Sequence, residues 1–139
     1  MYKDLPAGMI SLFQSAYNFM KRQLDGVSLN GKVVMESYIN AWFFLYTHQG
    51  IFDPNGRDII VDKYPETLAM YKALMERENH HLPILYIADS TLNLPLCPGC
   101  VDVNIDFFAT NEHNFYRRSF FYEKLAPLLK LGARIIGTY

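Results

Sequence analysis

The sequence predicts an α/β fold built on a doubly wound, mainly parallel sheet with helices on both faces. Short β-branched runs alternate along the chain with segments of helical periodicity, and this alternation is typical of parallel strands joined by helical crossovers. Acidic residues end or closely follow three of these runs, at Asp62, Asp89 and Asp106. Because ligands of open α/β sheets bind beyond the carboxyl ends of the strands, we expect a site there that holds hydroxyl and amino groups of a nucleoside.

The composition indicates one folded domain over residues 1–139. Half of the residues are hydrophobic and 15% are aromatic, which is enough for a buried core and unlike a disordered chain. A formal charge of −1 argues against nucleic-acid binding. No apolar run approaches the roughly 20 residues of a membrane span, and the first residues lack the apolar stretch of a signal peptide. With two cysteines, we expect a cytoplasmic protein with reduced thiols.

The chain divides into an N-terminal helical segment, residues 1–29, and an α/β core, residues 30–139. Apolar residues between positions 8 and 25 recur at three-four spacing, which predicts an amphipathic helix. The apolar run at 32–36 predicts the first strand. The aromatic-rich stretch at 40–48 predicts a second helix that is buried on most sides.

The middle of the chain contains three further strands. The run at 58–62 predicts the second strand, and Pro65 then begins a helix that extends to about Asn79. The runs at 83–88 and 101–108 predict the third and fourth strands.

The last part of the chain predicts one more helix and strand. Apolar spacing over residues 114–131 indicates a helix, which Pro127 is expected to kink and Gly132 to cap. Residues 134–139 then predict a fifth strand.

Several segments, taken in order, resemble the class I S-adenosylmethionine-dependent methyltransferases. Residues 88–95, with an Ala-Asp start and a Leu-Pro end, resemble the acidic motif after the third strand of that family. Residues 101–108 resemble its fourth strand, residues 124–135 its following helix, turn and fifth strand, and residues 60–68 its second strand with the acid and next helix start. The resemblance covers about residues 30–139 and implies a Rossmann-like sheet of order 3-2-1-4-5.

The resemblance implies which part of S-adenosylmethionine each of three acids would contact. Asp62 would hold the ribose hydroxyls, because a carboxylate accepts two hydrogen bonds from a vicinal diol. Asp89 would accept the adenine amino group, while Ser90 and Leu92 would line the ring. Glu36, at the end of the first strand, would lie near the methionine end of S-adenosylmethionine.

The resemblance also implies where the methyl acceptor would bind. Asp106, Asn111 and Glu112 follow the fourth strand, where the family meets its acceptor, and Asp106 would also contact the cofactor. The implied reaction is methyl transfer to an unidentified acceptor, most simply a small molecule, with S-adenosylhomocysteine as the product. Holding the donor and the nucleophile in line supplies much of the catalysis in such a reaction.

A second hypothesis, a non-catalytic methyltransferase-like module for interaction or assembly, also follows from the sequence. The family has a glycine-rich turn after its first strand, whereas residues 36–42 contain no glycine. Tyr38 and Trp42 would occupy the space of the methionine tail. The family also has two strands beyond the fifth. Either this sequence is a fragment, or the edge formed by Ile135 and Ile136 is covered by another copy of the chain, as a homodimer.

A third hypothesis, a small zinc-bound interaction domain, rests on the pair Cys97 and Cys100. Zinc needs two further ligands, for which His80, His81 and His113 are the nearest candidates. A single cysteine pair is a weak signal for zinc, and it precedes a strand rather than opening a helix as redox pairs do. We therefore expect a loop with free thiols and no metal.

Overall fold

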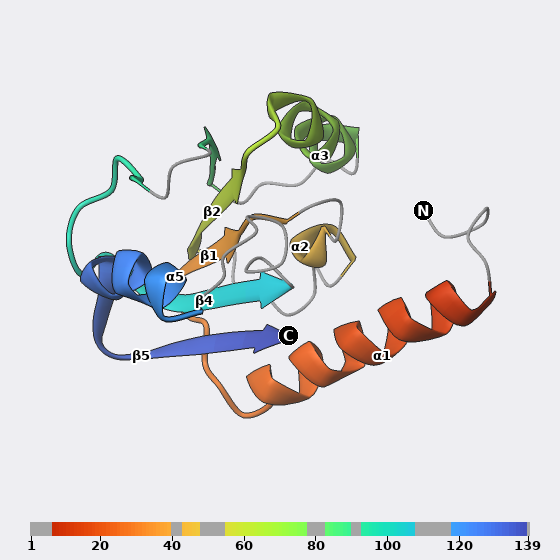
Figure 1. Ribbon diagram of the computed structural model, residues 1–139, viewed down its shortest axis with the longest axis horizontal. Coiled ribbons are helices and arrows are strands. Elements are labelled where there is room, and N and C mark those ends of the chain that lie inside the picture. The colour runs from red at the N-terminus through yellow and green to blue at the C-terminus, as the bar shows by residue number, and fades with distance from the viewer. Residues whose placement is uncertain are drawn as a thin grey trace.

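The computed structural model describes residues 7–39, 43–47, 55–77, 83–89, 93–107 and 118–138. Within these residues, parallel strands form one five-stranded sheet of order β3-β2-β1-β4-β5 (Figure 1). This confirms the predicted fold class and strand order. The strands are β1 (Val33–Ser37), β2 (Arg57–Asp62), β3 (Ile84–Ala88), β4 (Val101–Phe107) and β5 (Leu129–Thr138). The helices are α1 (Ala7–Leu24), α2 (Phe44–Thr47), α3 (Pro65–Arg77) and α5 (Arg118–Leu125), followed by the 3₁₀ turn η2 (Ala126–Leu128).

Each face of the sheet packs into its own hydrophobic core. Successive side chains of a strand point to opposite faces, so Val34 and Met35 enter different cores. The first core joins the sheet to α1, α2 and α3, and the second joins it to α5 and η2. Among the described residues, no helix is long and apolar enough to cross a membrane.

The end of the chain differs from the prediction of a helix over residues 114–131. Of this range, the part from Arg118 onward is described, and its helix ends at Leu125. The turn η2 follows, and β5 begins at Leu129, five residues before the predicted strand start at 134. The cause is Pro127, which cannot donate the helical hydrogen bond and whose ring clashes with the preceding turn.

Gly132 was expected to cap that helix, but it lies within β5. Its φ of +78° is in the left-handed region, which glycine adopts without a steric penalty. Between the pairs Val101–Leu129 and Val103–Arg134, the register shifts, so β5 carries extra residues that bulge from the ladder. Of the predicted helix at 40–48, Phe44–Thr47 form α2, whereas Phe43 precedes it in a left-handed conformation with a φ of +43°, and the other residues lie outside the described ranges.

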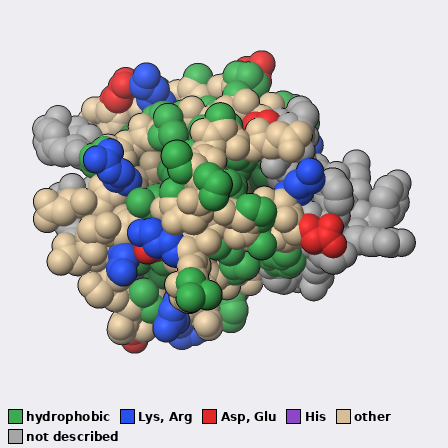
Figure 2. Space-filling view, turned by 90° about the vertical axis from the view of Figure 1, so that its left-hand side faces the viewer, with side chains coloured by type: hydrophobic (Ala, Val, Ile, Leu, Met, Phe, Trp, Pro, Cys, Tyr) green, Lys and Arg blue, Asp and Glu red, His purple; other side chains and the backbone are tan. Residues whose placement is uncertain are grey.

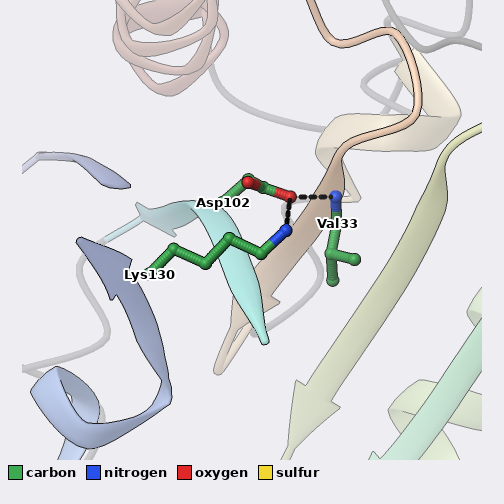
Figure 3. A network of polar contacts seen from close by, with 3 residues as sticks. All are labelled: Val33, Asp102 and Lys130. Carbon is green, nitrogen blue, oxygen red and sulfur yellow. Dashed lines mark hydrogen bonds and ion pairs between the residues drawn. The ribbon is translucent and has the colours of Figure 1, made fainter. Parts of the chain in front are cut away.

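One carboxylate ties three strands together at their amino ends. Oδ2 of Asp102 in β4 accepts hydrogen bonds from the Val33 backbone N–H at 2.8 Å and from Lys130 Nζ at 3.0 Å (Figure 3). Burial acts to raise the pKa of Asp102, but these two hydrogen bonds and the charges of Lys130 and Lys32 outweigh it, so the pKa lies below the usual value. A cleft of about 650 Å³ opens beside this contact. On this side of the molecule, Lys and Arg side chains are spread among apolar ones (Figure 2).

Asp102→Ala is expected to lower the free energy of unfolding by about 1–3 kcal/mol at neutral pH, because a part-buried N–H loses its acceptor. Urea unfolding measures the change. Asp25→Ala, an exposed acid just after α1, is the matched control and should change stability by less than about 0.5 kcal/mol. Equal stability of the two variants would show that the Asp102 contacts contribute nothing.

Candidate active site

The carboxyl ends of β1, β2 and β3 lie side by side and bring Asp62 and Asp89 together. Ser37 pairs with Val61, and Asp62 pairs with Ala88. The Asp89 N–H then donates to the Asp62 carbonyl oxygen at 2.9 Å, which continues the ladder by one residue. Two acids therefore follow one another across adjacent strand ends, at the edge where open α/β sheets bind ligands.

The Asp62 side chain is held by the turn that it begins. The residue is buried, and its Oδ1 accepts the Tyr64 backbone N–H at 2.9 Å. Aspartate favours this turn, in which its side chain accepts the backbone N–H of the residue two positions later. It also leads into α3, which begins at Pro65. The backbone thus fixes the orientation of this carboxylate.

The Asp89 side chain is bound by a tyrosine from two strands away. Tyr38 Oη donates to Asp89 Oδ2 at 3.0 Å, and the Tyr38 backbone N–H donates to the Val61 carbonyl oxygen at 2.7 Å. The Tyr38 side chain therefore runs from the end of β1 past the end of β2 to the residue after β3. It is 1% exposed, and its ring meets that of Phe121 edge to face, with centroids 6.3 Å apart.

One small cavity lies beside the Tyr38 ring, lined by described residues. The cavity there is about 10 Å³, which holds one water molecule at most. Its walls come from the end of β1, from the loop before β4 and from α5 and η2, namely Met35, Ser37, Tyr38, Leu94, Phe121, Lys124, Leu125 and Leu128. The side chain of Tyr38 thus fills this part of the sheet edge.

Glu36 lies on the opposite face of the sheet, beneath α2 and α3. It is 2% exposed, its Oε1 accepts the Leu45 N–H at 3.2 Å, and its Oε2 accepts Tyr71 Oη at 3.0 Å. Burial raises the pKa of Glu36 to about 7, although these hydrogen bonds act to lower it. The hydrogen-bond partners of Glu36 are therefore a backbone N–H and a tyrosine hydroxyl that belong to the first hydrophobic core.

A second buried acid, Asp58, shares this face with Glu36. In the β1–β2 register, Val34 pairs with Asp58 and Glu36 with Ile60, so the two acids are diagonal neighbours. Among the described residues, neither Asp58 oxygen has a hydrogen-bond donor at ordinary distance and angle. The two carboxyl groups are close enough to bond to one another. That bond requires a proton on one of them. Burial, and then the charge of Glu36, raise the pKa of Asp58 well above its usual value.

Sequence reasoning missed Asp58, Tyr71 and the Tyr38–Asp89 contact. A signal for Asp58 was present, because Asp58, Ile60 and Asp62 alternate along one strand and must share a face. Tyr71 had no comparable signal, since its approach to Glu36 depends on how α3 packs on the sheet.

The other predicted site residues are only partly described. Asp106 is fully buried near the end of β4, where it pairs with Gly137. Cys97 is exposed and Cys100 is partly buried, and both are free thiols. Across the described ranges, no group of three or more side chains could hold a metal ion. The remaining candidates lie outside the described residues: Trp42, His80, His81, Ser90, Leu92, Asn111, Glu112 and His113.

The strand order, the helices on both faces and the acids at the ends of β2 and β3 define a class I S-adenosylmethionine-dependent methyltransferase-like fold. The structure is similar to a SAM-dependent methyltransferase from Aquifex aeolicus, with a TM-score of 0.65 and 18% identity over 80% of this chain and 58% of that one. It is also similar to one from Mesorhizobium loti, with a TM-score of 0.65 and 14% identity over 90% of this chain and 53% of that one.

A third similar structure is geranyl diphosphate C-methyltransferase from Streptomyces coelicolor A3(2), in complex with Mg²⁺, geranyl-S-thiolodiphosphate and S-adenosylhomocysteine. Its TM-score is 0.67 and its identity 12%, over 85% of this chain and 41% of that one. The chain thus spans about half the length of these neighbours, between 41% and 58%. The sequence matches no family model and no curated protein.

Proposed function

We propose that this chain binds S-adenosylmethionine at the carboxyl ends of β1, β2 and β3 and acts in methyl transfer to a small-molecule acceptor. The observation that carries the proposal is the adjacency of Asp62 and Asp89 at neighbouring strand ends. Supporting it, two of the similar structures are SAM-dependent methyltransferases, and a third, a C-methyltransferase, holds S-adenosylhomocysteine.

The two carboxylates at this edge fit the cofactor, because each can accept hydrogen bonds from it. Asp89 already accepts a hydrogen bond from an O–H group at 3.0 Å, so its carboxylate is oriented to take an amino donor such as that of adenine. Asp62 Oδ1 accepts the Tyr64 backbone N–H, which orients a carboxylate of the kind that binds ribose hydroxyls. Bound S-adenosylmethionine supplies an activated methyl group on its sulfonium.

The protein's own contribution is to position the reactants. Asp62 and Asp89 anchor the nucleoside end at two fixed points, and Asp106, with Asn111 and Glu112, orients the acceptor beyond β4. Glu36 lies in the buried layer beneath this edge, under α2. Fixing donor and acceptor in line reduces the entropic part of the barrier, so no strong general base is needed for this role.

Asp62→Ala is expected to weaken S-adenosylhomocysteine binding by about 1–3 kcal/mol, the usual cost of losing a charged hydrogen-bond partner. Calorimetric titration of the intact and variant chains measures this loss, and Asp89→Ala should act in the same direction. Asp25→Ala, an exposed acid far along the chain from the site, is the control. Unchanged affinity in Asp62→Ala would remove that residue from the site.

A second candidate, a non-catalytic module with this fold, is favoured by Tyr38. Its ring fills the end of β1 where the family has glycine, and its hydroxyl takes up Asp89. The same titration separates the two functions. No binding to the intact chain at millimolar S-adenosylhomocysteine favours the module, and its partners should then be sought.

We also propose that a second copy of the chain covers the open edge of β5. Leu131 is fully exposed and Ile135 is 42% exposed. A groove of about 400 Å³ lies along this edge between α1 and Tyr122 of α5. Long edge strands with exposed apolar residues favour pairing with another chain.

Sedimentation velocity is expected to show a dimer that Ile135→Lys dissociates, because a charge on the edge opposes strand pairing. Leu85→Lys is the matched control, since Leu85 is an exposed apolar residue on β3, the other edge strand. A monomeric chain at high concentration contradicts the proposal. Dissociation by Leu85→Lys alone would place the interface at β3.

A further inference from the structure

Tyr38 adopts a backbone conformation that its side chain disfavours. Its φ is +56°, in the left-handed region, where a residue with a Cβ is strained and glycine is not. Strained residues of this kind persist only where the surrounding contacts hold them, and they cluster at functional sites. Tyr38 also lies in the segment 36–42, which contains no glycine although it corresponds to the glycine-rich turn of the family.

Contacts at both ends of the residue hold it in place. The backbone N–H donates to the Val61 carbonyl oxygen at 2.7 Å, and the hydroxyl donates to Asp89 Oδ2 at 3.0 Å. Between these two points the ring packs in the second hydrophobic core, against Phe121. The side chain is therefore a bridge from β1 to the residue after β3, and it covers the end of β2.

Tyr38 presents to Asp89 the same kinds of groups as a nucleobase that carries an amino group. Its flat aromatic ring lies in the apolar layer, and its edge carries one hydrogen-bond donor that reaches the carboxylate. An adenine ring with its exocyclic amino group combines the same two features. Among the described residues, the cavity beside the ring is only about 10 Å³, which is too small to hold a base next to Tyr38.

We propose that Tyr38 is a built-in competitor of the nucleoside: its side chain occupies the base site and its hydroxyl takes the hydrogen bond of Asp89 that the base amino group requires. The inference rests on the proposed function, because it assumes that Asp89 receives the base. For the base to bind, its amino group must replace the Tyr38 hydroxyl as the donor to Asp89. The Tyr38 ring must also leave the second hydrophobic core. The apparent affinity is then the intrinsic affinity multiplied by the fraction of molecules in which Tyr38 has left Asp89.

The test is calorimetric titration of the full chain and its variants with S-adenosylhomocysteine. Tyr38→Phe removes only the hydroxyl, and it is expected to tighten binding at least about tenfold, the usual value of one hydrogen bond to a charged group. Tyr38→Gly removes the ring and relieves the backbone strain, so it is expected to tighten binding further. Tyr64→Phe is the matched control, because it removes the hydroxyl of an exposed tyrosine next to the same site.

Each outcome decides the proposal. Tighter binding in Tyr38→Phe, with Tyr64→Phe unchanged, supports it, and this holds even if Tyr38→Gly fails to fold. Equal, measurable affinity in the intact chain, Tyr38→Phe and Tyr64→Phe overturns the competitor role and leaves the proposed function standing. No binding by the folded intact chain and the folded Tyr38→Phe at millimolar ligand overturns both.

Discussion

The free energy of unfolding is expected to fall by about 3 kcal/mol as the pH rises from 4.5 to above 7, through the Glu36 carboxyl. Burial raises the pKa of Glu36 from 4.5 to about 7, so the folded protein keeps a proton that the unfolded chain releases. This stabilisation is complete below the unfolded pKa and is lost as the pH passes the folded one. Asp58, whose pKa is also raised, shifts in the same direction.

Urea unfolding at several values between about pH 4.5 and pH 8 measures this slope. Asp102 does not mask it, because the pKa of Asp102 lies below 3.8 and its contribution changes only in more acidic solution. Glu36→Gln keeps the shape of the side chain and removes the titration of residue 36, so the slope should become shallower, while the contribution of the buried Asp58 remains. A slope as steep in Glu36→Gln as in the intact chain would exclude Glu36 as its origin.

Phe121→Ala is expected to lower the free energy of unfolding by about 3–5 kcal/mol, the range for removing a buried phenylalanine ring from a core. Phe121 is 1% exposed and lies where α5 packs on the sheet. Its ring also meets the ring of Tyr38. The substitution therefore leaves a cavity beside Tyr38 and weakens the layer that α5 forms on the second core.

The neighbouring residue provides the control for this effect. Tyr122 is on the same helix and in edge-to-face contact with Phe121, at 5.3 Å between centroids, but it is only half-buried. Tyr122→Ala should therefore cost clearly less than Phe121→Ala in the same urea titration. Equal losses would show that the second core does not depend on the buried ring.

Local patterns in the sequence were enough to locate the first four strands of the sheet. Runs of β-branched residues marked each strand to within one or two residues up to β4, because strands of a parallel sheet that is covered by helices are mainly apolar. Pro65 marked the start of α3 correctly. The acids that end β2 and follow β3 were likewise visible, since parallel strands bring their carboxyl ends to one edge.

The end of α5 was not visible in the same way. Apolar spacing continues through Pro127 into residues 129–131, and periodicity alone cannot separate a short apolar helix turn from the start of a strand. Pro127 ends the helix, and the ladder with β4 then makes residues 129–131 part of a strand: Leu129 pairs with Val101, and the bulge at Gly132 restores the register at Arg134.

The amino-acid sequence by itself thus determined the fold class and the edge of the sheet at which the acids Asp62 and Asp89 stand, because strand spacing and alternation are local properties. The strand order followed from the resemblance to the methyltransferase family, and the structure confirms it. Tertiary structure alone decided that Tyr38 reaches Asp89 across β2 and that Glu36 shares a buried layer with Asp58 and Tyr71. These contacts join residues far apart in the chain, and burial then sets their protonation. Such effects depend on distances and solvent exclusion that exist only once the helices pack on the sheet.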